Sequence, residues 1–125
     1  MSLPKKIFNK CKEITFCKTI YKSRESGLIK FCGVRDKRVG NGTVLYSIPN
    51  NKSPKHPNIK AFHKAEIETL WIHLLDNKEI KTSNFKNLCA ELYKEGGCCF
   101  SAFYGIINTL YPKVFIKGHG IIKFK

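Results

Sequence analysis

The residues that could support hydrolysis are scattered along this chain. Asp36, His56, His63 and Glu79 carry side chains with which a metal-dependent nuclease could hold a cation and activate water. None of them has a partner at a recognisable spacing, and the nine acidic residues leave few from which to build a two-metal site. The sequence therefore predicts no catalytic residue and no enzyme, with a small metal-dependent nuclease as the enzymatic alternative.

Six cysteines are the other reactive side chains of the chain. No two of them have the Cys-x2-Cys spacing of a zinc site, and the adjacent Cys98 and Cys99 cannot easily bridge each other. Most of the six lie among Phe, Leu and Ile, where a thiol packs as a small apolar group. We therefore predict reduced thiols, no bound metal and no cofactor. The six are Cys11, Cys17, Cys32, Cys89, Cys98 and Cys99.

The sequence lacks the marks of a secreted or membrane protein. Its first residues, MSLPKKIFNKC, contain no apolar signal core and no small-residue cleavage site. No stretch approaches the ~20 apolar residues that a transmembrane helix requires. These features predict a cytoplasmic protein with no membrane partner. The oligomeric state is left open, a dimer included.

Positive charge is the most unusual property of the composition. Twenty-three Lys and Arg against nine Asp and Glu give a net charge of +14 over 125 residues. Residues 1–60 carry +11 of it and residues 61–125 carry +3. A surface field of this sign concentrates polyanions and releases counterions from phosphates. A nucleic acid is therefore the expected partner, and an acidic protein is the alternative.

Residues 1–50 are predicted to form a basic β-hairpin or a three-stranded meander. Pro4 can open a short helix, and the β-branched and aromatic residues of 14–21 favour a strand, although one helix over 4–22 is the alternative. Asn41-Gly42 between two β-prone runs predicts a tight hairpin turn with positive φ at its central residues. Three cations just before this turn are candidates to grip phosphates: Arg35, Lys37 and Arg38.

Residues 51–60 predict a linker, because two prolines there break both helices and strand ladders. A helical period follows from Ala61, with an apolar stripe that can face a core. A short connector over 78–81 could form a small strand. The stripe consists of Ile67, Leu70, Trp71, Leu74 and Leu75.

Two further helices and a hairpin are predicted after this connector. Thr82 or Ser83 can cap a helix that the Gly96-Gly97 pair ends. The inner face of this helix should be Phe85, Leu88, Cys89 and Leu92. The next helix, over 100–110, should turn Phe100, Phe103, Ile107 and Leu110 inward, and Pro112 prevents its continuation. A basic hairpin over 114–124 follows, with Gly118-His119-Gly120 at its tip.

This order of helix, helix, helix and hairpin over 61–125 resembles a winged helix-turn-helix domain. The resemblance implies that the helix over 100–110 lies in the DNA major groove and that the hairpin, the wing, touches the flanking backbone or minor groove. The outward set of that helix would be Ser101, Ala102, Tyr104, Gly105, Asn108 and Thr109. The wing would contribute Lys113, Lys117, His119, Lys123 and Lys125. Two features depart from the pattern: the turn YKEGGCCF is long, and the recognition helix has no Lys or Arg.

Together these observations predict an α+β protein with a basic β region over 1–50, a linker over 51–60 and a winged-helix-like domain over 61–125. The expected function is non-catalytic binding of double-stranded DNA as a regulatory or accessory factor, for example in transcription. A module that binds an acidic protein is the alternative of a different class.

Overall fold

The computed structural model describes residues 3–14, 19–21, 28–35, 42–48, 58–94 and 98–125. The described residues form five helices and two antiparallel sheets, an α+β fold as the sequence predicted. The first elements are α1 (Phe8–Cys11), β1 (Thr19–Tyr21), β2 (Leu28–Arg35), β3 (Thr43–Ile48) and β4 (Asn58–His63). The others are α2 (Lys64–Asn77), β5 (Glu79–Lys81), α3 (Thr82–Leu88), α4 (Ala90–Lys94), α5 (Cys98–Leu110), β6 (Phe115–Gly118) and β7 (Ile121–Phe124).

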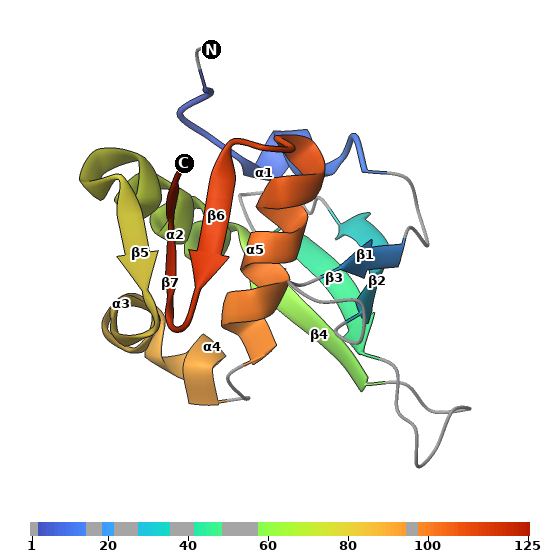
Figure 1. The fold of residues 1–125 in the computed structure, drawn as a ribbon. Helices are drawn as coiled ribbons and strands as arrows, with labels where there is room; N and C mark the ends of the chain where they lie inside the picture. The colour runs from blue at the N-terminus through green and yellow to red at the C-terminus, as the bar shows by residue number, and fades with distance from the viewer. Residues whose placement is uncertain (1–2, 15–18, 22–27, 36–41, 49–57, 95–97) are drawn as a thin grey trace.

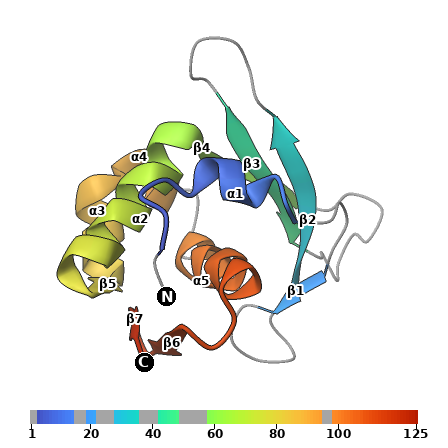
Figure 2. The same cartoon turned by 90° about the horizontal axis from the view of Figure 1, so that it is seen from above.

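Helix α5 lies at the centre of the molecule. In Figure 1 it stands between β6 on one side and β1 on the other, and in the view from above (Figure 2) α5 lies between α2 on the left and β1 on the right. The larger sheet has the strand order β1-β2-β3-β4 and the smaller one has the order β5-β7-β6. The helix that was predicted to contact DNA is therefore flanked by a sheet on each side.

The N-terminal part is an antiparallel meander, as predicted, with a short helix before it. Strand β1 follows α1, so one continuous helix over 4–22 is excluded. The prediction of a tight two-residue turn at Asn41-Gly42 was wrong. Strand β2 ends at Arg35 and β3 begins at Thr43, so seven residues connect them. Positive φ is found instead at Gly33 (103°), where the β2–β3 register shifts at a bulge.

The predicted linker also needs a correction at its end. Residues 58–60 are the first three of β4, which pairs with β3 along its whole length, and the rest of the linker lies outside the described residues. β4 runs directly into α2 without a connecting loop. The helical period was therefore placed three residues early, because Ala61, Phe62 and His63 complete the strand before α2 starts at Lys64.

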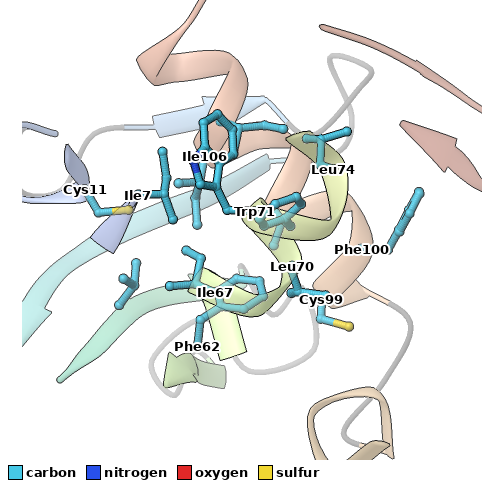
Figure 3. Packing of buried hydrophobic residues seen from close by; sticks show 14 of the residues in the cluster. Ile7, Cys11, Phe62, Ile67, Leu70, Trp71, Leu74, Cys99, Phe100 and Ile106 are labelled. Carbon is cyan, nitrogen blue, oxygen red and sulfur yellow. The ribbon is translucent and has the colours of Figure 1, made fainter. Parts of the chain in front are cut away.

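One hydrophobic cluster joins the meander to the helices. The buried side chains of Val44 and Phe62 from the sheet belong to the same cluster as those of Ile67 and Trp71 from α2 and Phe103 from α5. Figure 3 shows Ile7 and Cys11 reaching into this cluster from the N-terminal segment. The two parts therefore share a core, and neither buries its apolar face alone.

The N-terminal segment is fixed to α2 by two polar contacts. The Glu68 carboxylate accepts hydrogen bonds from the backbone N–H groups of Ile7 and Phe8, the latter at 2.9 Å. The indole of Trp71 donates to the carbonyl of Pro4 at 2.9 Å. Since a short helix cannot satisfy its first N–H groups itself, Glu68 acts as the cap that α1 lacks locally.

The helix predicted after the connector is divided in two. Cys89 has the non-helical angles φ −138° and ψ 64°, which separate α3 from α4. Leu88, at the end of α3, is exposed rather than part of the inner face, while Phe85, Cys89 and Leu92 are buried as predicted. The prediction that Thr82 or Ser83 caps this helix was also wrong: the N-cap residue is Lys81, and its N–H donates to the Asn84 side chain at 2.8 Å.

Gly42 is needed for close packing and not for a positive φ. A Cβ atom at this position would lie 2.2 Å from Cζ of Phe8, a ring that also has the Lys64 ammonium 5.2 Å from its centroid. The Gly42 carbonyl accepts from the Lys64 N–H at 2.8 Å, which holds the backbone against the ring.

We expect Gly42→Ala to destabilise the fold by about 1–3 kcal/mol, because a well-packed site has to shift to admit a methyl group. Urea denaturation of the variant measures this loss. In the background Phe8→Leu, which removes the clashing ring atoms, the same substitution should cost clearly less. An equal cost in both backgrounds would contradict the assignment to Phe8.

Candidate nucleic-acid interface

Aromatic contacts fix the position of α5. Near its start, the Phe85 ring from α3 packs edge-on against Phe100 (5.1 Å between centroids) and Phe103 (5.7 Å). On another side Phe62 of β4 meets Phe103 at 6.4 Å. These contacts hold the helix against both α3 and the larger sheet, so α5 cannot shift independently of either.

The partly open face of α5 is a narrow polar stripe. Ser101, Tyr104 and Asn108, three predicted contact residues, follow one another at intervals of three and four and are all half-buried. Burial raises the pKa of the Tyr104 hydroxyl, so it remains a neutral donor at physiological pH. None of the α5 residues 99–110 is exposed.

Three other predicted outward residues of α5 have different environments. Ala102 and Gly105 are buried, so they are not available to a ligand. The Thr109 hydroxyl donates to the Gly105 carbonyl at 2.8 Å, a contact within the helix. The helical period predicted that these residues face outward, because it can indicate only one buried face. In the structure α5 is covered on two sides.

The wing is part of a three-stranded sheet. β7 pairs with β6 on one side and with β5 on the other, so β5 from before α3 becomes an edge of the wing sheet. Two residues, His119 and Gly120, connect β6 to β7, and His119 is exposed at the tip, as expected. The backbone N–H and the hydroxyl of Thr82 both donate to the Gly120 carbonyl, at 3.1 and 3.2 Å. The tip is thereby fixed to the start of α3.

Most wing lysines lie at the base of the hairpin and not at its tip. Lys113, Lys123 and Lys125 are exposed there, and Lys78 joins them because its carbonyl accepts from the Phe124 N–H. The Lys78 ammonium lies 5.4 Å from the centroid of the Phe124 ring. We call Lys78, Lys113, Lys123 and Lys125 the base lysines. Lys78 was not among the predicted binding residues, although its charge and the predicted strand over 78–81 could be read from the sequence.

Lys117 has a different position from the base lysines. It is half-buried on the inner face of the hairpin, and its ammonium lies 5.7 Å from the centroid of the Phe100 ring near the start of α5. Lys81, which pairs with Ile121 near the tip, lies 3.7 Å from the Glu79 carboxylate. Cations therefore occur at both ends of α5, beside its start through Lys117 and after its end at Lys113.

The predicted phosphate contacts of the N-terminal half can be placed only in part. The backbone of Arg35 ends β2 and pairs with Thr43 of β3. Lys37 and Arg38 lie outside the described residues, as do the nuclease candidates Asp36 and His56. His63 and Glu79 lie on different elements, and the described ranges contain no group of three or more His, Cys, Asp or Glu that could hold a metal ion.

The thiols of Cys11 and Cys89 are buried and free. Burial, with a smaller contribution from the Glu68 carboxylate, raises the pKa of Cys11 to about 12. Burial and then Glu66 raise the pKa of Cys89 to about 11. Both groups are protonated at neutral pH, which makes them poor nucleophiles and poor metal ligands.

Comparison with protein-family models, curated proteins and solved structures found no match for this chain. Among the residues that the structure describes, no helix combines the length and the apolar character needed to cross a bilayer.

The wing tip provides a test of its own geometry. Gly120 has φ 72°, and a Cβ atom there would lie 3.0 Å from the Thr82 hydroxyl oxygen. We expect Gly120→Ala to cost about 1–2 kcal/mol of stability, because a side chain disfavours this backbone region. Gly118→Ala is the matched control, since its Cβ meets only Cγ2 of Ile121 at 3.2 Å and its φ is not positive. Thermal denaturation that ranks Gly118→Ala as the more damaging change would contradict the described turn.

Proposed function

We propose that this chain is a non-catalytic protein that binds double-stranded DNA, as a regulatory or accessory factor. The unit from α2 to β7 acts in this proposal as a winged helix-turn-helix, with α5 as its recognition helix. The observation that carries the proposal is the order of α2, α3–α4, α5 and a basic hairpin whose second strand pairs with β5. A net charge of +14 supports a polyanionic partner.

The two parts of this interface have different chemistry. Ser101, Tyr104 and Asn108 are neutral hydrogen-bonding side chains that suit base edges, sugars or phosphate oxygens. The base lysines supply charge, and neutralising phosphates releases counterions from the DNA. In this proposal the stripe on α5 therefore orients the protein on the duplex, while the wing provides most of the affinity of this half.

The half-burial of α5 limits how it can meet DNA. β1 and β6 flank the helix, and Ser101, Tyr104 and Asn108 on its partly exposed face would be the residues that meet a groove. A helix that cannot project far makes few base contacts, so phosphate contacts should dominate the binding energy. The proposal accordingly predicts strong salt dependence and modest sequence preference.

A salt titration of duplex binding measures the phosphate contacts. We expect Lys123→Gln/Lys125→Gln to weaken binding and to flatten the plot of log K against log salt by about 0.9 per lost contact. The matched control is Lys5→Gln/Lys6→Gln, which removes two exposed charges from the N-terminal segment. In Figure 1 that segment lies at the top, on the same side of the molecule as the C-terminus, so this pair tests whether loss of charge outside the hairpin is enough to weaken binding.

Two outcomes of this titration would count against the proposal. An equal effect of both variant pairs would mean that total charge, and not the wing, sets the affinity. Binding that is insensitive to salt would exclude phosphate contacts. Tight binding to an acidic protein, with none to the duplex, would favour the alternative in which the basic surface recognises protein.

The role of Asn108 can be separated from that of the lysines. Asparagine can pair with both N6 and N7 of adenine, so Asn108→Ala should reduce discrimination at one base position by about 1–3 kcal/mol and leave the salt slope unchanged. Selection from a randomised duplex pool followed by binding measurements gives both quantities. Thr109→Val is the control, because that hydroxyl is already bonded within the helix. Unchanged base preference in Asn108→Ala would remove α5 from the reading role.

A further inference from the structure

A second surface, on α2 and the α3–α4 break, has a character opposite to that of the wing. An open hollow of about 290 Å³ lies there beside a smaller one of about 140 Å³. Glu66 and Glu91 line both hollows, so the two form one groove with these carboxylates in its middle. The larger hollow is also lined by Ala65, Thr69, Leu88, Cys89 and Ala90, and the smaller one by Ala61, His63 and Leu92.

The larger hollow lies at the break in the helix, beside an exposed apolar side chain. Leu88 is the last residue of α3, directly before the non-helical Cys89, and its side chain is 39% exposed. Its neighbours in the groove, Ala65 and Ala90, are small, which leaves room for an incoming side chain against the leucine. Burying such apolar surface contributes about 25 cal/mol per Å² to binding.

Glu66 and Glu91 bring two acidic residues to the groove, and its described lining includes no lysine or arginine. Glu66 is held in place because its Oε1 accepts from the His63 N–H at 2.9 Å. Its charge also contributes, after burial, to the raised pKa of the neighbouring Cys89 thiol. The groove is therefore apolar at the leucine and anionic along its middle.

We propose that this groove binds a peptide segment of another protein that carries a lysine or arginine next to an apolar residue. The cation lies between Glu66 and Glu91, and the apolar side chain fills the larger hollow against Leu88. Charge complementarity selects a cationic occupant. A second copy of the chain is disfavoured because two chains that each carry a net charge of +14 repel each other. The proposal does not depend on DNA binding.

Titration of the ¹⁵N-labelled protein with two peptides tests this assignment. The probes are the capped hexapeptides Lys-Leu-Ala-Lys-Leu-Ala and Glu-Leu-Ala-Glu-Leu-Ala. We expect the lysine peptide to shift the amide signals of Thr69, Leu88, Ala90 and Glu91, and the glutamate peptide to shift none of them. Wing amides, such as that of His119, serve as an internal reference and should remain unchanged.

Two double variants isolate the charge of the groove. Glu66→Gln/Glu91→Gln should weaken binding of the lysine peptide at least tenfold. A glutamine at position 66 still offers an oxygen to the His63 N–H, so the helix start and the thermal midpoint should be preserved. Asp76→Asn/Glu79→Gln removes the same charge outside the groove and should leave the affinity within about twofold.

Three results would overturn the proposal. The first is the absence of shifts at millimolar lysine peptide, and the second is equal affinity of the wild-type protein and Glu66→Gln/Glu91→Gln. The third is self-association in sedimentation experiments that the same double variant abolishes, without any peptide shift. That last result would assign the groove to a second copy of the chain.

Discussion

The contacts of Trp71 are the constraint on which the rest of the structure depends. This side chain is completely buried, and its indole N–H donates to Pro4, so no polar atom of the ring is left unsatisfied. One face of the ring stacks on Tyr111 at 5.8 Å, and its edge meets Phe115 at the same distance. A single residue of α2 thus positions the N-terminal segment, the end of α5 and the first strand of the wing.

A second set of aromatic contacts determines how much of α5 is available for binding. Phe85 and Phe62 hold the helix from two directions, through Phe100 and Phe103. This packing explains why the apolar content of α5 is high and its polar stripe is narrow. A rigid, half-buried helix has a fixed geometry but presents few side chains to a ligand. The long-range attraction to a polyanion therefore has to come from lysines on other elements.

The sequence predicted most elements but not their surroundings. Periodicity located the buried stripe of α2 from Ile67 to Leu74, the end of α5 before Pro112 and both strands of the wing, because these patterns are local. The split at Cys89 was not visible, since its φ and ψ depend on contacts with α2. The burial of Ala102 was missed for a similar reason: a helical pattern shows one inner face and cannot show that β1 covers another side.

The same distinction applies to the candidate interface. Ser101, Tyr104 and Asn108 could be grouped from their spacing alone, because positions three and four apart share a helix face. The base lysines could not, since Lys78 joins Lys123 only through the pairing of β5 with β7. Charge that is distant in sequence becomes local only when strand order is known. For Gly42 the sequence predicted a positive φ in a tight turn, and this reason for glycine was wrong. The contact that requires glycine comes from Phe8, which is far away in the chain.

The separation of the cations along α5 bears on how the proposed interface would work. Lys117 lies beside the start of α5 and Lys113 follows its end, and because the two residues are four apart in the chain, their Cα atoms are at most about 14 Å apart. The Debye length at physiological ionic strength is about 8 Å, so exposed charges farther apart than this interact only weakly through solvent. In the proposed interface each lysine would therefore meet its own phosphate. Since the major groove is about 12 Å wide, cations at this separation suit phosphates on opposite sides of the groove, with the neutral stripe of α5 between them.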